Sequence, residues 1–106
     1  IYGSGSPTAL HPFETDKGIT TRDRSDIQAC DILLVNAIGI TVTSVGTAIE
    51  LGWADAFRKP IVMVLPKKEQ PTHPFNHGMV REITGYTVEN LDEGLYICQV
   101  ILQRGQ

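Results

Sequence analysis

The stretch ILLVNAIGI, residues 32–40, decides the fold of this 106-residue chain. It is an almost continuous run of β-branched and other apolar residues, which is typical of a strand buried on both faces of a parallel sheet. A second run of this kind, IVMVLP, occupies residues 61–66, and YTVE at residues 86–89 predicts a third, shorter strand. Strands of this composition need helices on both faces of the sheet to cover them.

Helical segments separate the strands. The sequence predicts a helix over residues 20–31 that begins near Thr20 or Thr21, one over residues 47–57 and a short one over residues 79–84. A last helix is predicted from about Asn90 or Asp92, with an apolar stripe at helical spacing formed by Leu91, Leu95, Cys98, Ile101 and Leu102. Alternating strands and helices predict one α/β domain over residues 1–106, a three-layer sandwich with a mostly parallel sheet.

Charge and composition exclude several classes of function. Nine basic and twelve acidic residues give a net charge of -3 without a Lys/Arg cluster, so we expect no nucleic acid polymer as partner. No apolar run approaches the roughly 18 residues of a membrane helix. The opening IYGSGSP has no basic region before an apolar stretch, so no signal peptide is expected, and its GSGSP part, residues 3–7, predicts a loop.

The cysteines and histidines carry weak signals. Cys30 and Cys98 lie in apolar surroundings and form no C-x-x-C pair, which favours buried, reduced thiols in a cytoplasmic protein. His73 and His77 are four residues apart, but Pro74 between them disfavours a regular helical metal pair, so we interpret both as loop residues and expect no metal site.

The segment SVGTAIELGWA, residues 44–54, contains a single charge, Glu50. One interpretation is structural, because Thr47-x-x-Glu50 fits a capping box, and so does Thr20-x-x-Asp23 on the preceding helix. The other is functional, because a helix entered from the carboxyl edge of a parallel sheet points its first turn at the ligand cleft. Gly46 and the free amides there could hold a phosphate. Glu50 could then attack a sugar carbon as nucleophile, with Asp23 as the second carboxyl group of a retaining mechanism.

A group of motifs resembles a known family. Asp23 lies eight residues before Asp31, the strand ILLVN follows, and residues 44–64 read SVGTAIELGWADAFRKPIVMV. Together they resemble the nucleoside 2-deoxyribosyltransferase family, which includes the 2'-deoxynucleoside 5'-monophosphate N-glycosidases. The family pattern is a small-residue turn, then Glu-Leu-Gly-aromatic-Ala and later Gly-Lys-Pro. This chain has Ser44-Val45-Gly46, Glu50-Leu51-Gly52-Trp53-Ala54 and Arg58-Lys59-Pro60, within a resemblance that covers residues 18–103.

The resemblance implies a Rossmann-like or flavodoxin-like fold with a shortened N-terminal part, because only residues 1–22 precede Asp23. It implies that Glu50 is the nucleophile and Asp23 the acid/base residue that handles the nucleobase. It also implies a set of substrate-binding residues around the sugar and its 5' group: Asn36, Ser44, Gly46 and Thr47.

The implied activity is transfer of a 2-deoxyribosyl group from a 2'-deoxynucleoside to another base through a covalent glycosyl-Glu50 intermediate, without metal or organic cofactor. Two alternatives stay open: a 5'-monophosphate N-glycosidase, in which water replaces the incoming base, and a non-catalytic nucleotide-binding module, in which both acids only cap helices. The implied partners are a deoxynucleoside or deoxynucleotide and a free nucleobase. The resemblance further implies a homodimer or higher homo-oligomer, with the loop over residues 67–77 as our candidate for the contact.

Overall fold

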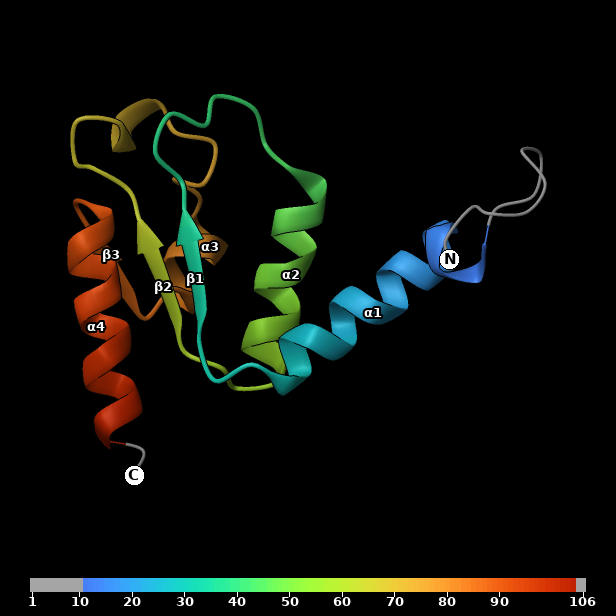
Figure 1. Ribbon diagram of the computed structural model, residues 1–106. Helices are drawn as coiled ribbons and strands as arrows, with labels where there is room; N and C mark the ends of the chain where they lie inside the picture. Colours follow the sequence, from blue (N-terminus) through green and yellow to red (C-terminus); the bar gives the residue numbers. More distant parts are fainter. Residues whose placement is uncertain (1–10, 105–106) are drawn as a thin grey trace.

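Three parallel strands form the central sheet of the computed structural model, which describes residues 11–104 (Figure 1). They are β1 (Leu33–Asn36), β2 (Ile61–Val64) and β3 (Tyr86–Val88), side by side in that order. In the parallel register Leu33 is opposite Ile61 and Val62 is opposite Tyr86. The predicted α/β fold with a parallel sheet is confirmed. The loop predicted for residues 3–7 lies outside the described residues.

The central and edge strands differ in burial. All four residues of β2 are buried, as a continuous apolar run predicts. In β1 only Val35 is buried, and Asn36 is exposed, so the prediction of burial on both faces is wrong for this strand. The reason is its position, because β1 has one strand neighbour within residues 11–104, and α1 (Asp16–Ala29) leads away from the sheet (Figure 1).

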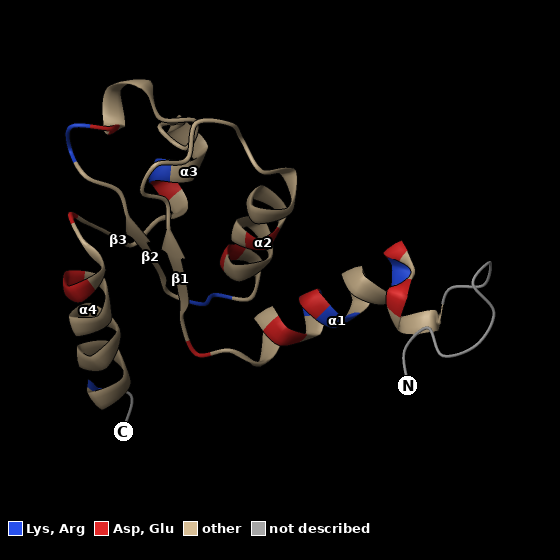
Figure 2. Ribbon diagram, turned by 45° about the horizontal axis from the view of Figure 1, so that its top comes forward, with Lys and Arg blue, Asp and Glu red and all other residues tan. Residues whose placement is uncertain are grey.

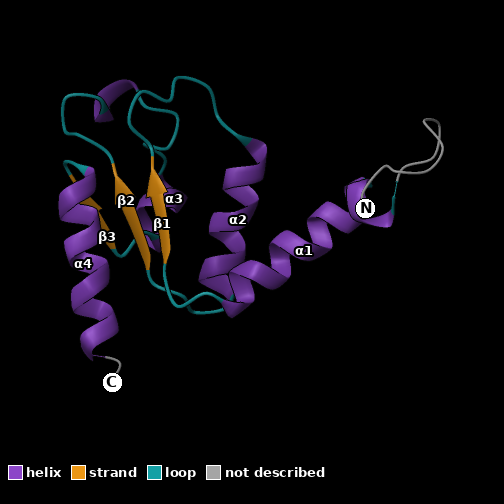
Figure 3. Ribbon diagram, in the orientation of Figure 1, coloured by secondary structure: helices purple, strands orange, loops and turns teal. Residues whose placement is uncertain are grey.

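Helices cover both faces of the sheet, as Figure 3 shows. α4 (Leu91–Arg104) packs on one face, while α2 (Val45–Ala56) and α3 (Gly78–Ile83) lie on the other. Since side chains alternate along a strand, Met63 and Leu65 point towards α2 and α3 and join the main core. That core also contains Leu51 and Ala54 of α2. Within residues 11–104, no helix is long and apolar enough to span a membrane.

α4 packs on the sheet through a glycine. Gly94 is buried, and a Cβ atom there would lie 3.0 Å from Val64 Cγ2 and 3.1 Å from Leu34 Cδ1. The predicted apolar stripe is therefore only partly correct, because this close approach selects a different face of the helix. Cys98 and Ile101 are half-buried. The three leucines of the stripe are exposed at 40%, 52% and 44%: Leu91, Leu95 and Leu102.

α1 begins earlier than predicted. The hydroxyl of Thr15 accepts a hydrogen bond from the Gly18 amide at 3.0 Å, so Thr15 is the N-cap and Asp16 the first helical residue. A short 3-10 helix, η1 (Pro12–Glu14), precedes this cap. The predicted start near Thr20 or Thr21 is wrong, because Thr15 caps the helix one turn earlier and its hydroxyl accepts from the Gly18 amide. A second 3-10 helix, η2 (Gln70–Thr72), lies in the loop between β2 and α3.

Candidate active site

The N-terminus of α2 lies at the carboxyl edge of the sheet, where the strands of Figure 1 point. Ser44 is its N-cap, and its hydroxyl oxygen accepts a hydrogen bond from the Thr47 amide at 3.2 Å. Thr47 is thus inside the first turn, and the prediction that Thr47 caps this helix is wrong. Among residues 11–104, the amides of Val45 and Gly46 have no hydrogen-bond acceptor. Two free amides and two hydroxyl groups therefore surround an exposed helix N-terminus.

Glu50 lies one turn further along α2. Positions three and four apart share a side of a helix, so Glu50 follows Thr47 and Gly46 on one side of α2. Its side chain is half-buried and makes no hydrogen bond or ion pair with other described residues. The capping-box interpretation of Glu50 is excluded, since Ser44 is the N-cap. The carboxylate is therefore free to contact a ligand.

Asp23 lies in the interior of α1, on a half-buried position. Because Thr15 caps this helix, the capping interpretation of Asp23 is also excluded. α1 and α2 contact each other, and the Arg24 guanidinium lies 5.9 Å from the centroid of a Trp53 ring. Asp23 is the neighbour of Arg24, and Glu50 is one turn from Trp53 on α2. The fold thus brings the two helices that carry the carboxylates together, and the catalytic pairing of the two groups stays a prediction.

Asn36 ends β1 at the same edge, as predicted. Its Oδ1 accepts a hydrogen bond from the Ile38 amide at 3.3 Å, which turns the chain at the end of the strand. Asn36 is exposed, so its side-chain amide group remains available to a ligand. Its place in the sugar pocket stays a prediction.

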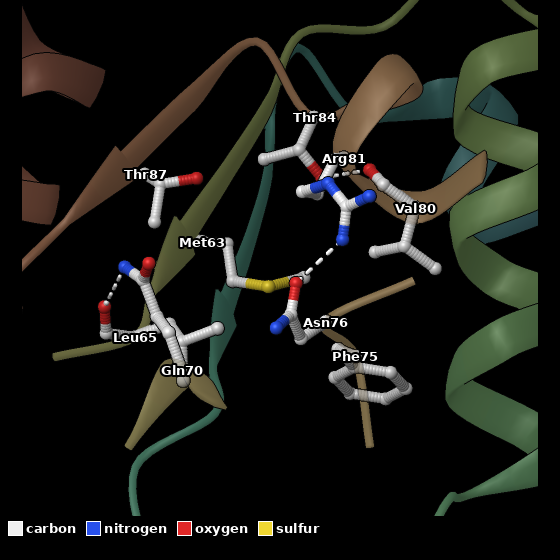
Figure 4. Close-up of a pocket in the computed structure, with 9 residues that line it drawn as sticks. All are labelled: Met63, Leu65, Gln70, Phe75, Asn76, Val80, Arg81, Thr84 and Thr87. Atoms are coloured by element: carbon white, nitrogen blue, oxygen red, sulfur yellow. Dashed lines mark hydrogen bonds between the residues drawn. The ribbon is translucent and has the colours of Figure 1, made fainter. Parts of the chain in front are cut away.

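A separate cavity of about 110 Å³ lies beneath α3, on the same face of the sheet as α2 (Figure 4). Arg81 of α3 donates a hydrogen bond to Asn76 Oδ1 across it, and Gln70 Nε2 donates to the Leu65 carbonyl at 3.2 Å. The cavity is below the roughly 300 Å³ of typical ligand pockets and contains none of the predicted site residues. Its lining is Met63, Leu65, Gln70, Phe75, Asn76, Val80, Arg81, Thr84 and Thr87.

Sequence reasoning missed one residue of this edge. His73 is 6% exposed, and its imidazole lies between the loop after β1 and the loop after β2, 2.8 Å from the Ala37 carbonyl. A histidine beside a proline in a polar stretch carries no periodic signal of burial, so only the fold reveals its position. His77, in contrast, is an exposed N-cap of α3.

Neither the basic residues nor the two cysteines form an alternative candidate site to the carboxylates. Over residues 11–104, the Lys and Arg positions are spread over several elements and alternate with Asp and Glu positions (Figure 2). Burial raises the pKa of the Cys98 thiol, so this group is less nucleophilic near neutral pH. Cys30 Sγ donates a hydrogen bond to the Ile27 carbonyl at 3.0 Å.

Comparisons with known proteins show which family the chain resembles. A family model described as nucleoside 2-deoxyribosyltransferase matches residues 4–96. The solved structure of the CMP N-glycosidase BcmB of Clostridium botulinum matches with a TM-score of 0.57 and 28% sequence identity, over 88% of this chain and 74% of that chain. No curated protein sequence matches at a significant level. The family match spans every predicted site residue, from Asp23 to Glu50.

Proposed function

The chain belongs to the nucleoside 2-deoxyribosyltransferase family, and on this basis we propose that it cleaves the N-glycosidic bond of a 2'-deoxynucleoside and transfers the 2-deoxyribosyl group to another nucleobase. The family comprises enzymes that transfer or hydrolyse such glycosyl groups. The observation that carries the proposal is the place of Glu50, half-buried and without a partner among residues 11–104, one turn below the open N-terminus of α2.

In the first step a carboxylate oxygen of Glu50 bonds to C1' of the sugar as the bond from C1' to the base nitrogen breaks. The electron pair of that bond leaves with the base, and Asp23 donates the proton that neutralises it. In the second step Asp23 takes a proton from the incoming base, whose nitrogen attacks C1' and releases Glu50. This scheme requires two carboxyl groups about 5 Å apart. It needs no redox change, since both steps are substitutions at C1'.

Hydrolysis of a nucleoside 5'-monophosphate is the second candidate, with water as the acceptor in the second step. Two observations favour it. One is the likeness to a CMP N-glycosidase. The other is the set of donors at the N-terminus of α2, where the Val45 and Gly46 amides and the Ser44 hydroxyl, which itself accepts a hydrogen bond from the Thr47 hydroxyl, could hold a phosphate.

The protein should be incubated with thymidine, deoxycytidine and deoxycytidine 5'-monophosphate, each with and without free adenine, and the bases followed by chromatography. Appearance of deoxyadenosine or its monophosphate only with adenine supports the transferase. Release of base without adenine supports the hydrolase. Binding without turnover would leave a nucleotide-binding module and contradict both.

We also propose that the enzyme works as a homo-oligomer in which residues 67–77 contact a second copy. Met79, in the first turn of α3 directly after this loop, is 74% exposed, and a contact through this region would bury it. Light scattering on the wild type and on Met79→Glu tests it. A dimer that the substitution dissociates supports the proposal, and an active monomer contradicts it.

A further inference from the structure

Two loops meet at the carboxyl edge of the sheet, and hydrogen bonds join them at two points. The first loop runs from Ala37 to Ser44 between β1 and α2, and the second joins β2 to α3 and contains η2. His73 Nε2 lies 2.8 Å from the Ala37 carbonyl oxygen, and Glu69 Oε1 accepts a hydrogen bond from the Gly39 amide at 2.7 Å. The two bonds connect residues that are 36 and 30 positions apart in the chain, respectively.

The chemistry of these partners fixes the state of the imidazole. A carbonyl oxygen only accepts, so Nε2 of His73 must carry a hydrogen and donate it to Ala37. Nδ1 accepts a hydrogen bond from the Phe75 amide at 3.0 Å, so Nδ1 must be unprotonated. His73 is therefore the neutral Nε2–H tautomer, with one bond inside its own loop and one to the other loop.

The first loop is anchored at Ala37, and the residues after Ala37 are the part that the bonds from His73 and Glu69 restrain. Ala37 is fully buried and its amide donates to the Val64 carbonyl at 2.9 Å, which anchors the start of the first loop to β2. Beyond it, Gly39 has a φ of 75° and Val42 is 77% exposed. Without the two bonds, the path from Ala37 to the N-cap Ser44 would have one internal hydrogen bond, from the Ile40 amide to the Ala37 carbonyl.

From this arrangement we infer that His73 is a positioning residue, which together with Glu69 holds the loop between β1 and α2 and so fixes Ser44 and the N-terminus of α2 for the substrate. The inference rests on the proposed function where it concerns substrate, and on the loop contacts alone where it concerns structure. His73 touches no reacting atom in this account.

Amide hydrogen exchange on the full chain tests the contact directly. In His73→Asn the shorter side chain can still accept from the Phe75 amide but cannot reach Ala37, so exchange at Gly39 and Ile40 should become about tenfold faster while Phe75 stays protected. In His73→Gln the amide nitrogen can reach Ala37 but Nδ1 is lost, so Phe75 should exchange faster and Gly39 should stay near the wild-type rate.

His77→Asn is the matched control, because His77 Nδ1 accepts from the Met79 amide at 3.1 Å in the same manner and has no bond to the first loop. It should leave Gly39 and Ile40 unchanged. Unchanged exchange in His73→Asn, or an equal change in His77→Asn, overturns the inference. If His73→Asn does not fold, His73→Gln decides, and fast exchange at both Gly39 and Phe75 then overturns it.

Binding of deoxycytidine 5'-monophosphate, measured by calorimetry, tests the consequence for substrate. His73→Asn should weaken binding about tenfold and raise KM without a matching loss of kcat, and His73→Gln should restore most of the affinity. Equal losses in both variants would overturn the positioning role. If the wild type binds no nucleoside or nucleotide, the proposed function fails, while the exchange rates still decide whether His73 holds the loop.

Discussion

The Ser44 hydroxyl accepts a hydrogen bond from the Thr47 amide at 3.2 Å, and the hydroxyl oxygens of the two residues lie 3.1 Å apart. Ser44 therefore caps α2, and the helix begins at Val45. Glu50 is therefore not in the first turn of the helix, and it cannot be explained as part of a capping box. The cap at Ser44 also leaves the Val45 and Gly46 amides without a partner among residues 11–104, one turn from the carboxylate.

The first prediction separates the cap from the phosphate site. Aspartate is as good an N-cap as serine, so Ser44→Asp should keep the free energy of unfolding within about 0.5 kcal/mol, whereas Ser44→Ala should lose about 0.5–2 kcal/mol. The added charge in Ser44→Asp should weaken binding of deoxycytidine 5'-monophosphate at least about tenfold and leave deoxycytidine nearly unaffected. Calorimetry with both compounds measures this. If Ser44→Asp weakens the binding of both compounds equally, the 5'-phosphate does not bind at the N-terminus of α2.

The second prediction concerns the packing of α4. A Cβ at Gly94 would lie 3.0 Å from Val64 Cγ2, so Gly94→Ala should destabilise the protein by about 1–3 kcal/mol despite the better helix propensity of alanine. Gly52→Ala on α2 is the control, because nothing lies within 4 Å of its Cβ position, and it should stabilise by up to about 1 kcal/mol. Denaturant unfolding compares the two. A stabilised Gly94→Ala would contradict this prediction and would show that the Val64 and Leu34 side chains can move aside for the added methyl group.

The third prediction concerns Asp23 as the acid. Asp23→Asn should slow cleavage of natural deoxynucleosides by about 10²–10⁴, because their bases need a proton to leave. A deoxyribosyl substrate with an activated leaving group should be affected far less. Asp26→Asn, on an exposed position of α1, is the control and should behave as wild type. Equal losses on both substrates would mean that Asp23 is not the acid.

The sequence predicts well those elements whose residues are chosen for burial in the core. IVMV at residues 61–64 is apolar without interruption, and every one of its residues is buried in β2. The parallel sheet and the position of Asn36 at a strand end follow from the same reasoning and are confirmed.

Helix starts and helix faces are harder to predict, because several residues compete for one role. Ser44 and Thr47 can both cap a helix, and Thr15 and Thr20 compete in the same way, so a capping motif identifies a region and not a residue. In α4, apolar spacing favours the leucines, but the absence of a side chain at Gly94 allows the closest approach and decides the face.

In the candidate site, too, some features can be predicted from the sequence and others only from the structure. Glu50 stands out in the sequence because one charge interrupts an apolar segment, and the family match spans it. His73 and the cavity beside Arg81 depend on contacts between segments far apart in the chain, for which a single sequence has no local signal.

The central claim is that Glu50 forms a covalent bond to the sugar, and peptide mass spectrometry of the trapped protein tests it most directly. The protein should be mixed with a 2'-fluorinated deoxynucleoside, because fluorine slows release of the glycosyl group, then quenched and digested. We predict one added glycosyl group, on the peptide that contains Glu50, in the wild type and in Asp55→Asn, a control at a half-buried carboxylate of the same helix. The adduct should be absent in Glu50→Gln. Turnover of deoxynucleosides without any adduct, or an adduct that persists in Glu50→Gln, would contradict the account.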